Sequence, residues 1–142
     1  MIDNAIIDLN DFKIISLIGE GNFARVFLIE QNETKVKYAA KIWKESCIKK
    51  EHQKCFFVEI ETFLKTKYPT ILRFIGFNML DFELCPCPTF ITEYASNGSL
   101  SSLLDKIYRS QAPNDWTDTK KYIILLGIAL GMNFLHSHNI VH

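Results

Sequence analysis

The sequence predicts an α+β fold in which a sheet-rich first part is followed by helices. Apolar and β-branched runs dominate the chain up to about residue 94, whereas helical spacing of apolar residues dominates after residue 99. The short polar segment 95–98 separates these two parts. A chain of 142 residues has room for one ordinary domain or two small lobes.

We expect five strands and one helix in the first part. The strands are predicted at residues 12–18, 26–29, 36–43, 71–75 and 89–92, each bounded by glycine, proline or polar turns. The helix is predicted over residues 51–67, where Phe56, Ile60, Phe63 and Leu64 share one face. Pro69 prevents this helix from continuing.

The second part is predicted to be helical. A short helix covers residues 99–108, and Thr117 or Asp118 caps a long helix that continues to about His136. The long helix is apolar around most of its circumference, so we expect it to require protein cover on nearly all sides. If that cover is missing, association or aggregation should follow.

Composition excludes several classes of protein. Basic and acidic residues number 16 each, so no net field draws the chain toward nucleic acid or an anionic membrane. The most apolar stretch, residues 122–135, is fourteen residues long, and a bilayer span needs about 20. The acidic N-terminus does not resemble a signal peptide, so we expect a cytoplasmic protein with reduced thiols. Cys85 and Cys87 have no second pair at zinc spacing, so we assign no metal site.

Gly19 and Gly21 provide the first chemical signal. Two closely spaced glycines permit positive φ and let backbone N–H groups approach an anion. The residues that follow them are predicted to form a strand, which excludes a dinucleotide-binding helix start. No Gly-Lys-Ser/Thr sequence occurs, which excludes a Walker-type loop. The remaining interpretations are a plain hairpin or a hairpin that covers phosphates.

With its flanking residues, this turn resembles the glycine-rich loop of protein kinases, G-x-G-x-x-G-x-V. Gly19, Gly21 and Val26 are in register, and Ala24 replaces the third glycine. The family also has a lysine on the third strand, which Lys41 matches after Tyr38-Ala39-Ala40. The resemblance extends from Phe12 to His142 and implies an N-lobe, with a five-stranded antiparallel sheet and one long helix, followed by the first helices of a truncated C-lobe.

The resemblance implies two catalytic residues, Lys41 and Glu59. Lys41 would bind the α- and β-phosphates of ATP, and a glutamate on the helix would hold it in place. In the family, this glutamate stands at a fixed distance before the loop position that Tyr68 occupies here. That distance selects Glu59 and leaves Glu51 and Glu61 as surface residues. The residues around Lys41 support this role independently, because an ammonium group among apolar neighbours requires a partner of opposite charge.

The resemblance also implies an ATP-binding surface. Thr92 would guard the back pocket, while backbone groups of Glu93 and Ala95 would pair with the adenine edge. Flat apolar side chains would cover the purine, and Ser99 would contact the ribose. The residues that this places around ATP, beside Lys41, are Ile18, Gly19, Glu20, Gly21, Asn22, Phe23, Ala24, Val26, Ala39, Thr92, Glu93, Ala95 and Ser99.

These matches predict a division into an N-terminal extension (1–11), an N-lobe (12–94), a hinge (95–98) and the start of an incomplete C-lobe (99–142). His142 matches the histidine of the family's His-Arg-Asp triplet, so the catalytic aspartate and the Mg²⁺ ligands would follow it. We therefore expect a protein kinase domain, with Ser/Thr hydroxyls as acceptors and an unknown protein substrate. The 142 residues alone are expected to be inactive. The alternatives are a nucleotide-binding pseudokinase, a scaffolding fragment and an interaction domain that binds no nucleotide.

Overall fold

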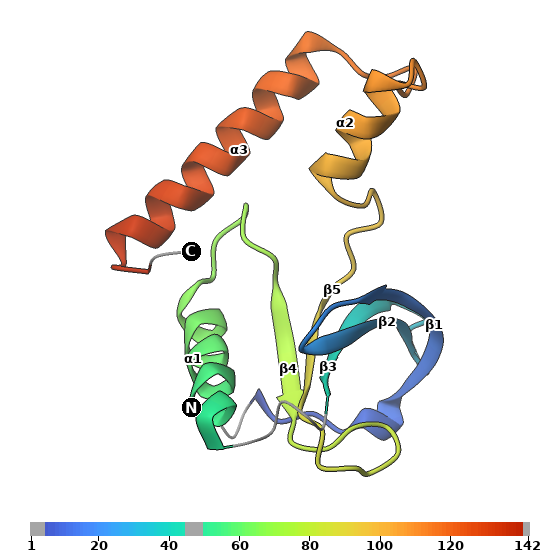
Figure 1. Ribbon diagram of the computed structural model, residues 1–142, viewed down its shortest axis with the longest axis vertical. Helices are drawn as coiled ribbons and strands as arrows, with labels where there is room; N and C mark the ends of the chain where they lie inside the picture. The colour runs from blue at the N-terminus through green and yellow to red at the C-terminus, as the bar shows by residue number, and fades with distance from the viewer. Residues whose placement is uncertain (1–4, 45–49, 141–142) are drawn as a thin grey trace. The chain divides into compact units, whose positions relative to one another are not determined.

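The computed structural model describes residues 5–44 and 50–140, with side chains in the second range described from Phe56 onward. Five strands form one antiparallel sheet in the order β1-β2-β3-β5-β4 (Figure 1). The strands are β1 (Phe12–Glu20), β2 (Ala24–Gln31), β3 (Lys37–Trp43), β4 (Phe74–Asn78) and β5 (Thr89–Glu93). The helices are α1 (Lys50–Lys65), α2 (Leu100–Tyr108) and α3 (Asp118–Ser137). The predicted α+β fold class is confirmed.

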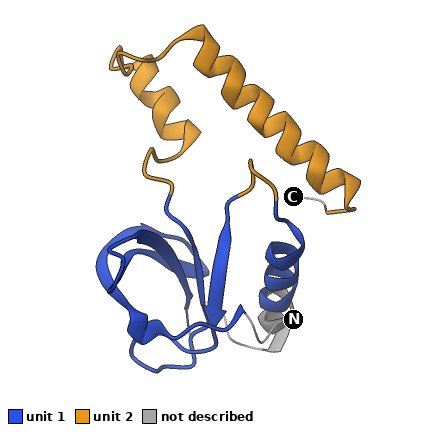
Figure 2. Cartoon of the chain, turned by 180° about the vertical axis from the view of Figure 1, so that it is seen from behind, with its two compact units in different colours: residues 1–67, 72–94 blue, residues 68–71, 95–142 orange. Residues whose placement is uncertain are grey.

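The chain divides into two compact units (Figure 2). The first contains residues 1–67 and 72–94, and therefore the sheet and α1. The second contains residues 68–71 and 95–142, and therefore α2 and α3.

The first unit has a hydrophobic cluster on each face of its sheet, because side chains alternate between faces along a strand. One cluster lies under α1 and contains Ala5, Trp43, Phe56, Ile60, Phe77 and Phe90. The other contains Leu9, Ile29, Ala40 and Ile91. Ala40 and Trp43, three positions apart on β3, and the adjacent residues Phe90 and Ile91 on β5 thus contribute to opposite faces of the same strands.

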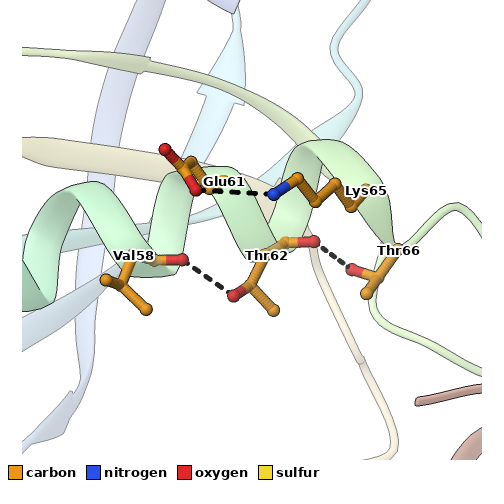
Figure 3. Close-up of polar contacts among 5 residues, drawn as sticks. All are labelled: Val58, Glu61, Thr62, Lys65 and Thr66. Carbon is orange, nitrogen blue, oxygen red and sulfur yellow. Dashed lines mark hydrogen bonds and ion pairs between the residues drawn. The ribbon is translucent and has the colours of Figure 1, made fainter. Parts of the chain in front are cut away.

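Helix α1 packs on the sheet through the apolar face that its spacing predicts. Phe56 and Ile60 are buried, and Phe63 stacks on Phe74 of β4 at 5.2 Å between ring centroids. Figure 3 shows the polar contacts along the last turns of α1. There the Thr62 hydroxyl donates to the Val58 carbonyl at 2.7 Å, and the buried Thr66 hydroxyl donates to the Thr62 carbonyl at 2.8 Å.

Residues 5–7 pack against β4. The Ile7 N–H donates to the Phe77 carbonyl, and the Asn78 side chain donates to the Ile7 carbonyl, at 3.0 and 2.8 Å. Gly76 makes this close approach possible, since a Cβ there would lie 2.6 Å from the Ala5 carbonyl oxygen. The segment before the first strand is therefore an integral part of the first unit's packing.

The fourth strand begins later than the sequence pattern suggested. The prediction placed it at residues 71–75, whereas β4 covers Phe74–Asn78. The preceding residues 68–71 belong to the second unit, where Tyr68 stacks on Phe134 at 4.6 Å and Thr70 lies against Gly131 of α3. These tertiary contacts override the β propensity of the apolar run.

In the second unit, both helices begin at a capping side chain, and of the two only the cap of α3 was predicted, as Thr117 or Asp118. The side chains of Ser99 and Thr117 accept hydrogen bonds from the backbone N–H groups of Ser102 and Lys120. Helix α3 buries only Gly131 and Leu135, and α2 buries no residue. Large apolar side chains remain exposed along α3: Tyr122, Ile123, Leu125, Leu126, Ile128 and Leu130. Within the described part of the chain, we find no helix with both the length and the apolar character that a membrane span requires.

Candidate functional site

The strand register places several of the predicted site residues on one face of the sheet. Lys41 is directly opposite Val26 on β2 and opposite Phe90 on β5. Two positions along the strand, Ala39 is opposite Thr92. Paired residues share a face, and so do residues two apart, so these five side chains project from the face on which α1 packs.

Lys41 and Glu59 meet on this face. The Lys41 ammonium Nζ lies 2.6 Å from Glu59 Oε1, which joins the third strand to α1 by a charge-assisted hydrogen bond. The two side chains are 37% and 28% exposed, respectively, so the pair remains accessible to solvent. An ammonium group has three donors, and an accessible one can accept a further anionic partner.

The structure also distinguishes Glu59 from its neighbour Glu61. Glu61 is exposed, and its carboxylate lies 3.5 Å from the ammonium of Lys65, one turn further along the helix surface (Figure 3). Such an exposed pair contributes little to stability. The side chain of Glu51 lies outside the described residues. Of Glu59 and Glu61, only Glu59 is paired with Lys41 of β3.

Aromatic rings surround the Lys41 ammonium, and sequence reasoning did not identify them as part of the site. Its nitrogen lies 5.2 Å from the centroid of the Trp43 ring and 6.0 Å from that of Phe90. Both rings are buried, and both belong to the cluster under α1. The alternation of Lys41 and Trp43 along one strand was the available signal, because residues two apart share a face.

The glycine turn forms a closed hairpin between β1 and β2. The Gly21 N–H donates to the Ala24 carbonyl at 2.9 Å, and the Lys44 N–H donates to the Phe23 carbonyl at 2.9 Å. Neither Gly19 nor Gly21 adopts a positive φ, unlike Gly98 at 74°. The freedom in φ that the sequence suggested is therefore not used in this turn.

Packing does not require glycine in the turn either. A Cβ on Gly19 would approach Val26 at 3.7 Å, and one on Gly21 would approach the Ala24 carbonyl oxygen at 3.8 Å. Both are ordinary van der Waals distances. Ala24, by contrast, is buried, so its methyl group fills space inside the protein where the related loop has its third glycine.

A second ion pair anchors the turn. The ammonium of Lys44, just after β3, lies 2.7 Å from Glu20 Oε1. The hydrogen bond from Lys44, followed by its positive charge, lowers the pKa of Glu20 from its ordinary value. The resemblance places Glu20 among the residues around ATP but does not identify Lys44 as its partner. The antiparallel pairing of Ala24 with Trp43 brings the turn and the end of β3 together.

At the end of β5, Thr92 and Glu93 form hydrogen bonds with other groups of the protein. The buried Thr92 hydroxyl donates to the Glu93 carbonyl at 3.2 Å. The Glu93 N–H donates to the Arg73 carbonyl at 2.9 Å, and the Glu93 carboxylate accepts from the Arg73 N–H at 2.7 Å. These hydrogen bonds fix the backbone at the end of β5, where the predicted hinge begins.

The remaining predicted residues are distributed as follows. Ile18 is exposed near the end of β1, and Asn22 and Phe23 are exposed at the tip of the turn. Ala95 and Ser99 belong to the second unit, where Ser99 caps α2, so their contact with a nucleotide stays a prediction. His142 lies outside the described residues. Within the described ranges, no group of three or more His, Cys, Asp or Glu side chains is placed to hold a metal ion.

Fold and site together define a class: an antiparallel five-stranded lobe whose third-strand lysine is paired with a glutamate of the packed helix, beside a glycine hairpin. The protein kinase domain model matches residues 12–142, and the chain therefore belongs to the protein kinase family. The resemblance inferred from the sequence is confirmed.

Curated relatives include several serine/threonine-protein kinases. The serine/threonine-protein kinase CG17528 of Drosophila melanogaster is 30% identical over 134 residues, which are 94% of this chain and 16% of that protein. GE16371 of Drosophila yakuba is 31% identical over 132 residues, 92% of this chain and 16% of that protein. PLK4 of Danio rerio is 27% identical over 135 residues, 94% of this chain and 13% of that protein. The chain thus spans about a sixth or less of the length of these relatives.

Proposed function

We propose that the first unit binds the phosphates of ATP, and that the whole protein transfers the γ-phosphate to serine or threonine hydroxyls of a protein substrate. The observation that carries the proposal is the 2.6 Å contact between Lys41 and Glu59 on the same sheet face as Val26, Ala39 and Thr92. Lys41 would bind the α- and β-phosphates, and Glu59 would hold it there. The relatives' description as serine/threonine-protein kinases supports the choice of acceptor.

The glycine turn supports a ligand above the pair. The packing and backbone angles of this protein would accept a side chain at Gly19 and Gly21, so its own fold does not explain two glycines there. A phosphate chain beneath the turn does explain them, because it needs close approach to the backbone. In this proposal the loop from Gly19 to Ala24 covers the phosphates.

We place the adenine ring against the sheet, beside the end of β5 and the hinge. Ile18, Val26 and Ala39 would cover the ring, and Thr92 would close the back of the pocket. Backbone groups of Glu93 and Ala95 would pair with the purine edge, and Ser99 would contact the ribose. The division into extension (1–11), N-lobe (12–94), hinge (95–98) and C-lobe start (99–142) belongs to the same proposal, as does a cytoplasmic location.

Mg²⁺ accompanies ATP in this family. The described residues contain no cluster of three or more acidic, His or Cys side chains that fits a metal ion, so we assign no step to a metal. We propose that a polypeptide of these 142 residues binds ATP without measurable phosphotransfer, because binding groups are present and the described residues include no such cluster for a metal ion. A nucleotide-binding pseudokinase would behave in the same way.

Calorimetric titration of the 142-residue chain with ATP tests the binding proposal. We expect Lys41→Met to weaken ATP binding about tenfold or more, because a charge-assisted contact to phosphate is lost. Lys37→Met is the matched control, since Lys37 lies exposed at the start of the same strand. Binding that is absent in the wild type, or equal in both variants, would refute the proposal. Turnover of radiolabelled ATP on a basic protein substrate would refute the claim of inactivity.

A further inference from the structure

The Lys41 ammonium is held by more than its carboxylate partner. The Lys41 nitrogen contacts Glu59 Oε1 at 2.6 Å. The same nitrogen also lies over the Trp43 ring, 5.2 Å from the ring centroid. A cation within about 6 Å of an aromatic centroid is attracted by the ring's quadrupole, most strongly for indole. Phe90, at 6.0 Å, lies at the limit of this range.

The Trp43 indole has no other polar partner. Its Nε1 is the one buried side-chain nitrogen or oxygen without a hydrogen-bond partner in the part of the chain that the structure describes. A phenyl ring would pack in an apolar cluster without leaving a donor unsatisfied. Packing alone therefore does not account for an indole here, whereas the stronger attraction of its face for an ammonium does.

Trp43 also contacts the helix that carries Glu59. Trp43, Phe56 and Phe90 form a closed group that we call the aromatic triad. Trp43 meets Phe56 and Phe90 edge to face, at 6.2 and 6.5 Å between centroids, and Phe56 stacks on Phe90 at 4.7 Å. Phe56 precedes Glu59 by three residues on α1, so the two side chains lie on adjoining parts of one helix face.

We propose that Trp43 is a positioning residue for Lys41. Its ring restricts the Lys41 side chain by a cation–π contact. The aromatic triad fixes the position of α1 on the sheet and thereby brings Glu59 to the same ammonium group. The inference rests on the proposed function only for its consequence, which is that ATP meets a lysine already ordered. Ordering a long side chain before the ligand arrives removes part of the entropy cost of binding.

A double-mutant cycle on the unfolding of the 142-residue chain tests the contact without nucleotide. We expect Lys41→Met and Trp43→Leu to be coupled by about two- to fivefold in the unfolding equilibrium constant. Trp43→Phe should show a smaller coupling of the same sign, because a phenyl ring retains part of the attraction. Lys37→Met paired with the same variants is the control and should show none. If Trp43→Leu fails to fold, the cycle with Trp43→Phe decides.

Fluorescence provides a readout that a packing role alone would not change. The chain has two tryptophans, so Trp116→Phe leaves Trp43 as the single emitter. We expect Lys41→Met to change the emission of Trp43 in the absence of nucleotide, whereas Lys37→Met should leave it unchanged. Unchanged emission together with zero coupling would overturn the inference.

ATP titration then separates this inference from the proposed function. If the wild type binds ATP, Trp43→Leu should weaken binding about two- to fivefold and Trp43→Phe by less. If the wild type binds no ATP, the proposed function fails, but the nucleotide-free coupling between Lys41 and Trp43 still decides the positioning role. Coupling without any loss of affinity in Trp43→Leu would overturn the consequence for ATP.

Discussion

The sheet unit and the helical unit of this chain are organised in opposite ways. In the sheet unit, Phe90, Ile29 and Ile91 are at most 1% exposed, and clusters occupy both faces of the sheet. In the helical unit, α2 buries no residue, and Leu126 on α3 is 60% exposed. The first unit is thus held together by a core, whereas the second depends on caps, local ion pairs and a few contacts around Tyr68 and Thr70.

This difference bears on where the candidate site lies. The Lys41–Glu59 pair lies against the aromatic triad, whose three residues are all buried, so its geometry is set by packing. The helical unit instead presents apolar side chains that gain nothing from exposure to water. We expect substitutions of equal size to have unequal effects in the two units.

Removing one large side chain from each unit should show the largest contrast. Phe90→Ala empties the centre of the cluster under α1 and should lower the free energy of unfolding by about 3–5 kcal/mol. Leu126→Ala removes an exposed side chain and should change it by less than about 0.5 kcal/mol. Denaturant unfolding followed by circular dichroism measures both. Equal losses would mean that α3 is buried in solution, for example by self-association.

Adding a methyl group should reverse sign between the units. Gly76→Ala places a Cβ 2.5 Å from Ile7 and should destabilise the chain by about 1–3 kcal/mol, since residues 5–7 must move. Gly127→Ala, within α3, meets only Thr70 at 3.8 Å and should raise stability by up to about 1 kcal/mol through helix propensity. The same unfolding experiment distinguishes them. A neutral Gly76→Ala would show that residues 5–7 do not pack on β4.

The sequence predicted the fold well where local pattern and tertiary packing agree. Strands β2, β3 and β5 follow from β-branched runs, and the cap of α3 is Thr117, one of the two residues predicted for it. The prediction failed at residues 71–73, because Tyr68 and Thr70 pack on α3 and delay the strand. It also missed the packing of residues 5–7, which carry no strand pattern and are placed by contacts with β4.

The candidate site was predictable in its charged pair and less so in its surroundings. The resemblance to protein kinases selected Lys41 and Glu59, and the structure places them in contact. The roles of Trp43 and Lys44 depend on which side chains the strand register brings together, and this register is not written in local spacing. Residue type permits positive φ at the two glycines, but the hairpin closes without it.

The smallest expected effect concerns acid pH, where the two units should respond alike. Glu20 in the first unit and Asp118 in the second each have a pKa lowered from its ordinary value, first by a hydrogen bond from a lysine and then by its charge. A lowered folded-state pKa stabilises the fold above the unfolded-state pKa, and that contribution is lost as pH falls through the folded-state pKa. For Glu20 the loss therefore begins near its ordinary value of 4.5 and is completed below it.

Comparing wild type with Glu20→Gln and Asp118→Asn from about pH 7 to about pH 3 tests this symmetry. Each variant should be slightly less stable than wild type at neutral pH, because an exposed ion pair contributes little. Each difference should vanish at acid pH, where the wild-type carboxyl is protonated. Glu33→Gln, at an exposed turn residue, is the control and should follow the wild type throughout. A Glu20→Gln difference that persists unchanged at acid pH would show that Glu20 acts through packing rather than through its charge. In that case the ion pair with Lys44 would not be what anchors the glycine turn.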